Sequence, residues 1–137
     1  MLPCEFTITG TPISHQTHNI ERLRLWQASV RNAATKKWPS DIPPTTVPLK
    51  ITVVYYHDRT TARIDNDNLI KPIQDALNGL IYVDDVQMTD TQIRKTDING
   101  SFHVRYISKV LANAFSDGAE FVYVKIEAAP DHKELLT

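Results

Sequence analysis

Four aspartates and one lysine in the middle of the chain have the residue types and the spacing to hold a divalent cation. Asp65 and Asp67 lie two residues apart just before an expected helix, so both carboxylates project to the same side of an extended segment. Magnesium takes oxygen ligands in octahedral geometry, usually carboxylates with water and phosphate oxygens. Asp84 and Asp85 follow the helix, and a strand returning beside the one before Asp65 would let three acids converge. The pattern is compatible with a magnesium site.

Lys71 lies four residues after Asp67, which is one turn along the same helical face. A lysine there could contact a phosphate or stabilise charge that develops on it, while the metal polarises the phosphate and lowers the pKa of an attacking water. Each residue also has a structural interpretation. Asp67 fits a helix N-cap, Lys71 a surface partner of Asp67 or Asp75, and Asp84–Asp85 a turn. Spacing alone is more typical of the structural interpretations.

Two other metal sites fit the sequence poorly. An EF-hand loop starting at Asp65 would need Asp or Asn, Gly and Glu at its fifth, sixth and twelfth positions, where the chain has Leu69, Ile70 and Ala76. His15 and His18 lie three residues apart without cysteine partners, so they are a weak zinc candidate. The single cysteine, Cys4, excludes an internal disulfide and a cysteine-based zinc cluster.

The elements that must position these residues follow from the apolar periodicity. Strands are expected at residues 4–10, 49–56, 86–95, 102–107 and 120–128, with a bulge or bend in the third and a hairpin turn at Asn99–Gly100. One helix runs from Ile20 and ends by Trp38–Pro39. Its apolar stripe is expected to hold Ile20, Leu23, Trp26 or Gln27, Val30, Ala33 and Ala34. A short helical or irregular piece is expected at 109–114.

The helix that follows the Asp-x-Asp pair is expected to begin near Asp67 or Asn68, so that Pro72 falls in its first turn, and to end at Asn78–Gly79. Together these elements predict an α+β fold. We expect one compact domain over residues 1–137, with about five strands in a mixed sheet, two main helices and a loose tail at 130–137. No apolar run approaches the roughly 20 residues of a membrane span and the start does not resemble a signal peptide, so a cytoplasmic protein is expected.

Charge is distributed unevenly along a chain whose net charge is −1. Residues 15–72 carry nine Lys or Arg against five acids, whereas residues 73–137 carry six against ten. Such asymmetry can give a basic face for phosphates, although a solvated helix surface explains it equally well. The candidate nucleic-acid-binding residues are Arg22, Arg24, Arg31, Lys36, Lys37, Arg59 and Arg63.

The stretch from Arg63 to Gln87, RIDNDNLIKPIQDALNGLIYVDDVQ, resembles the signature of the RusA-like Holliday junction resolvases. That family has Asp-x-Asp-Asn, a Lys three residues after the Asn, Asp-Ala-Leu, and then Asp-Asp-x-Gln. The matching residues here are Asp65, Asp67, Asn68, Lys71, Asp75-Ala76-Leu77 and Asp84-Asp85-Val86-Gln87. The Gly10-Thr-Pro12 turn before a basic helix is also similar to the family, so the resemblance extends over about residues 4 to 95.

By this resemblance Asp65, Asp67 and Asp85 would be the metal-binding catalytic carboxylates, Asp84 a lesser metal contributor and Lys71 an essential basic partner. The cofactor would be Mg²⁺, with Mn²⁺ as a substitute. The family implies a homodimer that resolves four-way DNA junctions by paired symmetrical nicks in DNA recombination and repair. Two alternatives stay open: a catalytically silent, dimeric nucleic-acid-binding module, and a nuclease that acts on flaps or other branched DNA.

Overall fold

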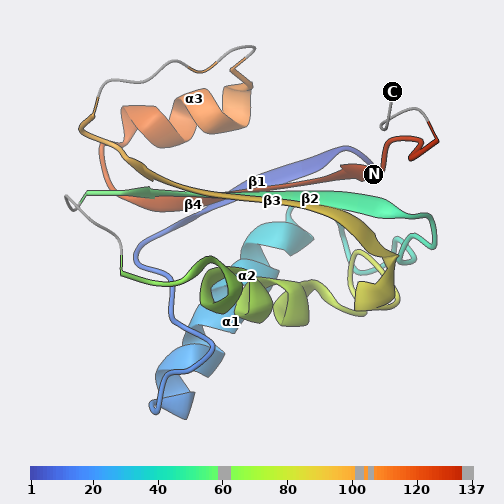
Figure 1. Cartoon of the computed structure of the whole chain (residues 1–137), viewed down its shortest axis with the longest axis horizontal. Helices are drawn as coiled ribbons and strands as arrows, with labels where there is room; N and C mark the ends of the chain where they lie inside the picture. The colour runs from blue at the N-terminus through green and yellow to red at the C-terminus, as the bar shows by residue number, and fades with distance from the viewer. Residues whose placement is uncertain (59–62, 101–103, 105–106, 134–137) are drawn as a thin grey trace.

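The elements form one four-stranded sheet with helices on both faces (Figure 1). The computed structural model describes residues 1–58, 63–100, 104 and 107–133. Helices α1 and α2 cover one face of the sheet, and α3 lies on the other (Figure 1). In chain order the elements are β1 (Cys4–Thr9), α1 (Ile20–Thr35), β2 (Leu49–His57), α2 (Asn66–Leu77), the 3₁₀ turn η1 (Asp85–Gln87), β3 (Met88–Asp97), α3 (Lys109–Ser116) and β4 (Phe121–Ala128).

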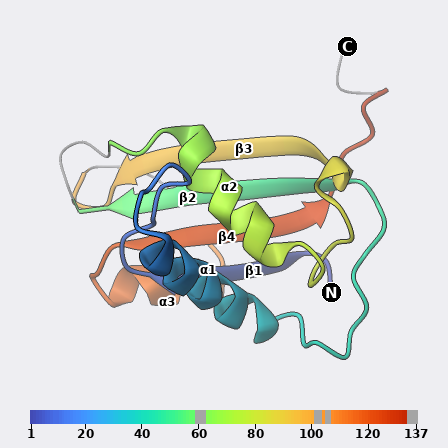
Figure 2. The same cartoon turned by 90° about the horizontal axis from the view of Figure 1, so that it is seen from below.

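The strand order is β1-β4-β2-β3, so the last strand in sequence lies inside the sheet (Figure 2). β4 pairs antiparallel with both β1 and β2, whereas β3 pairs parallel with β2. Helix α2 makes the crossover between these two parallel strands, as parallel pairing requires. The chain therefore leaves the end of β2, runs back along α2 and enters β3 beside the start of β2.

The sheet buries a different apolar set on each face. Against α1 and α2 it packs alternate strand residues such as Ile51, Val53 and Val124, which meet Val30 from α1 and Ile73 from α2. Against α3 it packs a smaller cluster made of Val54, Tyr56, Phe121, Tyr123, Leu111 and Ala114. The larger core lies under α2, so the helix that carries Asp67 and Lys71 is fixed by buried apolar contacts along its whole length.

Most of the expected elements are confirmed, including the irregularity in β3. Leu49 pairs with Met88 and Lys50 with Asp90, which leaves one extra residue in β3 at the expected bulge. Ile20 is the exception on the α1 stripe: it is 54% exposed at the helix start, because the core of this face begins only at Trp26.

The expected strand count differs from the observed one. The described sheet has four strands, and of the predicted strand at 102–107 only Val104 and Ile107 are described, neither of them in a strand. The other four positions lie outside the described residues. The chain does turn at Asn99–Gly100, where the backbone nitrogen of Gly100 donates to the oxygen of Asp97, but no described strand pairs back along β3, so the expected hairpin is not observed in the described residues. The short piece after it is a full helix, α3.

Pro72 lies inside α2 and not in its first turn as expected, because the helix begins at Asn66. Proline lacks the N–H that would bond to the carbonyl four residues earlier, which is that of Asn68. The backbone nitrogen of His15 fills this vacancy and donates to the Asn68 oxygen at 3.0 Å. The proline therefore leaves a carbonyl that attaches the loop after β1 to the start of α2.

Candidate metal and phosphate site along helix α2

Asp65 is the N-cap residue of α2, yet its side chain makes no capping hydrogen bond to the helix. Its extended backbone, with φ −68° and ψ 150°, places the carboxylate beside the first turn, where Asp67 also lies. Both side chains are exposed. The preceding residue is held in place because Nζ of Lys95 donates to the backbone oxygen of Ile64 at 2.9 Å. The backbone just before Asp65 is thus held by β3, and the Asp65 carboxylate makes no capping bond to the helix.

Two hollows flank the start of α2. One, of about 450 Å³, is lined by Asp65, Asn68 and Arg63, by Tyr55 from β2, and by the loop after β1. The other, of about 390 Å³, is lined by Asp67, Asn68 and Lys71 together with His15, Ile70 and Gln74. Asn68 borders both hollows, and the surface lined by Asp65, Asn68, Asp67 and Lys71 is called the α2 strip below.

Lys71 is paired toward the C-terminal end of α2. Its Nζ lies 3.0 Å from Oδ1 of Asp75 and 3.5 Å from Oδ2 of Asp85. The hydrogen bond and the charge of Asp75, followed by Asp85, raise the pKa of Lys71 above its ordinary value, so it is charged at neutral pH. Among the described residues no ion pair joins Lys71 to Asp67, so only part of the expected surface pairing is observed.

Asp85 is held by three side chains, of which Tyr82 is fully buried. The Tyr82 hydroxyl lies 3.1 Å from Oδ1 of Asp85 and 2.5 Å from the backbone oxygen of Gln74. Nδ2 of Asn78 lies 3.5 Å from the same carboxylate oxygen, and Lys71 approaches the other. Burial, and then the charge of Asp85, raise the pKa of Tyr82 far above its usual range, so its hydroxyl keeps its proton.

Asp84 has a local structural role. One of its carboxylate oxygens accepts from the backbone nitrogen of Val86 at 3.2 Å, while Oε1 of Gln87 accepts from the backbone nitrogen of Asp84 at 3.0 Å. This reciprocal capping box begins η1. Nε2 of Gln87 also donates to the backbone oxygens of Thr45 and Val47. The Asp-Asp-x-Gln motif thus fixes the turn that carries Asp85 to the connector before β2.

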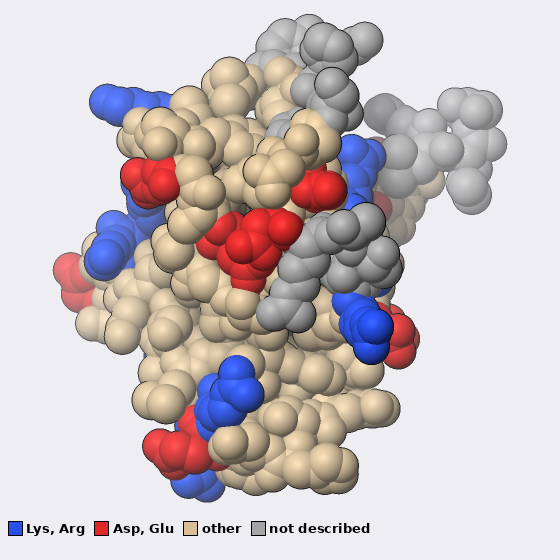
Figure 3. All heavy atoms as spheres, turned by 90° about the vertical axis from the view of Figure 1, so that its left-hand side faces the viewer, with Lys and Arg blue, Asp and Glu red and all other residues tan. Residues whose placement is uncertain are grey.

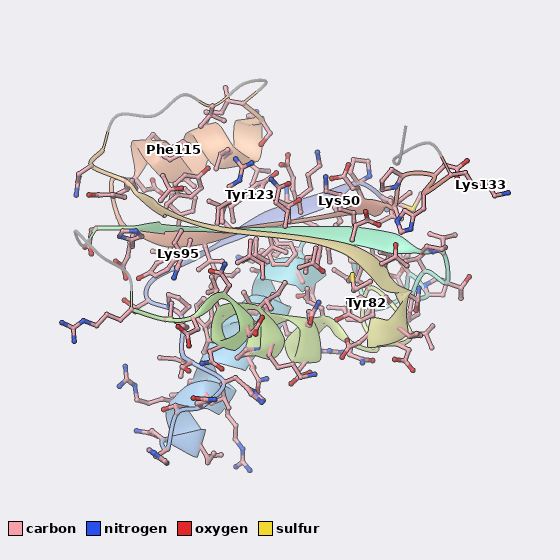
Figure 4. The ribbon with its side chains drawn as sticks, in the orientation of Figure 1. Lys50, Tyr82, Lys95, Phe115, Tyr123 and Lys133 are labelled. Carbon is pink, nitrogen blue, oxygen red and sulfur yellow. The ribbon has the colours of Figure 1, made fainter. Side chains whose placement is uncertain are left out.

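The proposed ligands lie toward opposite ends of α2 within one chain. The helix has 12 residues, which makes it about 18 Å long, and Asp65 precedes it whereas Asp85 follows it. Figure 4 makes the separation visible: Lys95, which binds the backbone next to Asp65, and Tyr82, which binds Asp85, lie at opposite ends of the α2 side of the sheet. The parallel pairing of β3 with β2 explains this, since the start of β3 meets the start of β2.

The convergence of three carboxylates expected from sequence is therefore not observed within one chain. Among residues 1–58, 63–100, 104 and 107–133, no group of three His, Cys, Asp or Glu side chains is close enough to hold a metal. Asp65 and Asp67 remain a suitable pair, because Mg²⁺ is commonly bound by one or two carboxylates plus water and substrate phosphate. The donor chemistry at the start of α2 fits the ion, and Asp85 contacts Lys71 instead.

The basic residues predicted from sequence are spread over several surfaces. Arg63 lines the hollow of Asp65, and Arg22 and Arg24 are exposed near the start of α1. Nη1 of Arg31 donates to the backbone oxygen of Ala76 at 2.9 Å, so it caps the end of α2. Lys36 and Lys37 border a separate hollow beside β1 and α3, and Arg59 lies outside the described residues.

The end of the molecule at which β2 finishes is acidic at its centre. Figure 3 faces this end and shows Asp and Glu side chains gathered near the middle, with Lys and Arg side chains around them. Basic side chains therefore surround this face and do not cover it. Contact with a polyanion here would need the central carboxylates to be neutralised, which a bound cation does.

Sequence reasoning missed the residues that hold the candidate groups in place. Tyr82 and Asn78 bind Asp85, and Lys95 binds the backbone before Asp65. Gln87 is part of the recognised motif, but the sequence assigns it no role. The sequence offers one usable signal, a tyrosine with its polar hydroxyl three residues before an aspartate in an otherwise apolar run.

The comparison with known protein families gives one match. The family model described as endodeoxyribonuclease RusA matches residues 5–105, a range that includes every candidate catalytic residue. No curated protein sequence matches the chain. None of the described helices is long and apolar enough to span a membrane.

Proposed function

The chain belongs to the endodeoxyribonuclease RusA family, and we propose that it is a magnesium-dependent endonuclease that resolves four-way DNA junctions by paired symmetrical nicks. The observation that carries the proposal is that the family match includes Asp65, Asp67, Lys71 and Asp85 in the family's order. A role in recombination and repair follows from this activity. The exposure of both aspartates and the absence of a capping bond from the Asp65 side chain support it, because both oxygens of that carboxylate are then accessible to a ligand.

In this proposal Asp65 and Asp67 hold Mg²⁺ at the start of α2, and Mn²⁺ substitutes for it. The bound ion supplies polarisation of the scissile phosphate and a lowered pKa for the attacking water. Lys71 presents a charged ammonium along the α2 strip, where it stabilises negative charge on the phosphate. Asp85 orients that ammonium through the 3.5 Å contact, and Tyr82 holds Asp85.

Paired nicks require two sites, so the proposal includes a homodimer with one site per chain. A two-fold protein matches the two-fold symmetry of a four-way junction, and one chain presents one Asp65–Asp67 pair. Light scattering of the purified chain, with and without junction DNA, tests this part. A mass of twice the 15.6 kDa of one chain is expected, and a monomer on the junction would contradict it.

The direct test incubates the purified chain and Mg²⁺ with labelled substrates: a four-way junction, a flap, a single strand and a linear duplex. Symmetrical nicks on the junction, lost with EDTA and restored with Mn²⁺, are expected. Products on the flap alone would indicate a flap nuclease. Binding to the junction without products on any substrate would indicate a silent nucleic-acid-binding module, and either result would defeat the proposal.

A further inference from the structure

Glu120, just before β4, is a buried carboxylate with three hydrogen-bond donors around it. Only 9% of the surface of Glu120 is exposed to solvent. Oε1 accepts from the hydroxyls of Thr11 and Tyr55, the latter at 3.2 Å, and Oε2 accepts from the backbone nitrogen of Asp58 at 3.3 Å. An ionised carboxylate is costly to bury unless such bonds compensate it, so an arrangement of this kind fixes its donors in place.

The charge state of Glu120 agrees with this geometry. Burial acts to raise the pKa of the carboxyl group, but the hydrogen bonds from Thr11, Asp58 and Tyr55 outweigh burial and lower the pKa below its ordinary value. The side chain is therefore ionised at neutral pH. An anion accepts stronger hydrogen bonds than a neutral group does, so each of the three donors is held more firmly.

Two of the three donors line the hollow that contains Asp65. Thr11 and Tyr55 line the hollow directly, and Asp58 ends the described part of the chain that leads from β2 toward Asp65. The loop that starts with Thr11 has its second attachment at α2, where the backbone nitrogen of His15 donates to the Asn68 oxygen. Glu120 thus ties the sheet to both walls of the hollow.

We propose that Glu120 is a positioning residue for the Asp65 site, where its carboxylate fixes the two walls that set the position of Asp65 relative to Asp67. This inference rests on the proposed function. It adds a residue from outside residues 5–105, the range that the family model matches. Glu120 acts through the walls and not as a ligand, because its oxygens accept from donors of the chain and its side chain does not line the hollow that contains Asp65.

The test compares Glu120→Gln with a matched control, Glu127→Gln. Glu127 lies on β4 near its other end, and the only ion pair of its side chain among the described residues is with Lys125, at 3.9 Å. In Glu120→Gln a neutral amide replaces the anion: an N–H turned toward Asp58 would oppose its backbone N–H, and an NH2 turned toward the two hydroxyls would reverse those bonds, so the charge-assisted hydrogen bonds are lost from at least one wall. Single-turnover cleavage of a labelled four-way junction is measured across a Mg²⁺ titration.

Glu120→Gln is expected to raise the half-saturating Mg²⁺ concentration by about tenfold, in the range seen when groups that support metal ligands are removed. Junction affinity in Ca²⁺ and the Glu127→Gln titration should match the wild type. A loss of rate at every Mg²⁺ concentration with an unchanged midpoint would overturn the proposal, because a residue that only supports folding acts in that way. An unchanged titration would overturn it as well.

Two further measurements keep the test decisive. If Glu120→Gln does not fold, Thr11→Val and Tyr55→Phe each remove one donor and should each raise the Mg²⁺ midpoint; normal midpoints in both would overturn the inference. If the wild type cuts no DNA, the proposed function fails by itself. Amide hydrogen exchange then tests the positioning role: exchange at His15 and Leu69 should be faster in Glu120→Gln than in Glu127→Gln, and equal exchange overturns it.

Discussion

The hydroxyl of Tyr82 lies 3.1 Å from a carboxylate oxygen of Asp85 and joins it to helix α2, because the same hydroxyl lies 2.5 Å from the backbone oxygen of Gln74. This buried group connects the turn after α2 to the face that carries Lys71. The Tyr82 hydroxyl therefore ties the position of the Asp85 carboxylate to that of helix α2. Removing the hydroxyl should disturb the carboxylate.

Tyr82→Phe removes this connection while keeping the ring in the core. We expect the free energy of unfolding to fall by about 1 kcal/mol, the usual net value of one hydrogen bond, and junction cleavage to fall several-fold because Asp85 is no longer held. Urea denaturation and single-turnover cleavage measure the two effects. Tyr123→Phe is the matched control, since its hydroxyl binds Glu5 at 2.5 Å on the α3 side of the sheet. The control should lose stability and keep its activity; a Tyr82→Phe enzyme as active as the wild type would refute this role.

Alkaline pH should destabilise the protein through Tyr82 and Tyr123. Burial raises the pKa of both hydroxyls above the ordinary value of 10. A raised folded-state pKa gives stability that is complete below pH about 10 and is lost above it, because only the unfolded chain then releases these protons. Urea denaturation at a series of pH values from about 8 to about 12 tests the sign. The fall in the free energy of unfolding with rising pH should be smaller in Tyr82→Phe than in the wild type. An equal fall in the two proteins would contradict the contribution of Tyr82.

Asp65→Asn and Asp67→Asn test the metal pair directly. Each change keeps the shape of the side chain and removes the charge that holds the ion, so cleavage should fall by at least about a hundredfold. Junction affinity in Ca²⁺ should be retained, since no basic surface is removed. Asp117→Asn at the end of α3, on the opposite face of the sheet, is the control and should cut normally. Normal cleavage by either Asp65→Asn or Asp67→Asn would remove that residue from the site.

Lys71→Gln separates a structural role from a functional one. The ion pairs of Lys71 are substantially exposed, with 44% of its side chain accessible, so their loss should change the free energy of unfolding by less than about 1 kcal/mol. Loss of a charged contact to a phosphate should lower cleavage by about 10- to 100-fold. Lys109→Gln on α3 is the control. If stability falls sharply while cleavage is unchanged, Lys71 belongs to the helix surface and not to the site.

The sequence predicts the elements well where one face is apolar. The spacing of Leu69, Ile73 and Leu77 identifies α2, and the parity change between Met88 and Ile93 identifies the bulge in β3. Both patterns are local in the sequence, so they can be recognised without knowing which helix or strand packs against them. The sequence predicts the start of α2 too late in the chain because proline is normally tolerated only in the first turn of a helix. In the structure, the backbone nitrogen of His15 donates to the Asn68 oxygen that Pro72 leaves without its usual donor, so Pro72 is tolerated in the helix interior.

The separation of Asp65 from Asp85 in space could not be predicted from the sequence. Whether the strand after Asp85 runs parallel or antiparallel to β2 decides which ends meet, and neither composition nor periodicity encodes that direction. The ties through Glu120 are equally hidden, since Thr11, Tyr55 and Glu120 are far apart in the chain and each is an ordinary residue type. Hydrogen bonds between residues far apart in the chain produce no periodic pattern in the sequence, so periodicity cannot predict them.

The position of β4 also has a consequence for synthesis on the ribosome. β1 and β2 do not touch each other in the sheet, and the strand that joins them is the last of the four to be translated. The larger core and the walls around Asp65 therefore cannot close until translation has passed Ala128 and that strand has emerged. A nascent chain stalled before Phe121 would expose unpaired edges on both strands, and chaperone binding should be strongest at that stage.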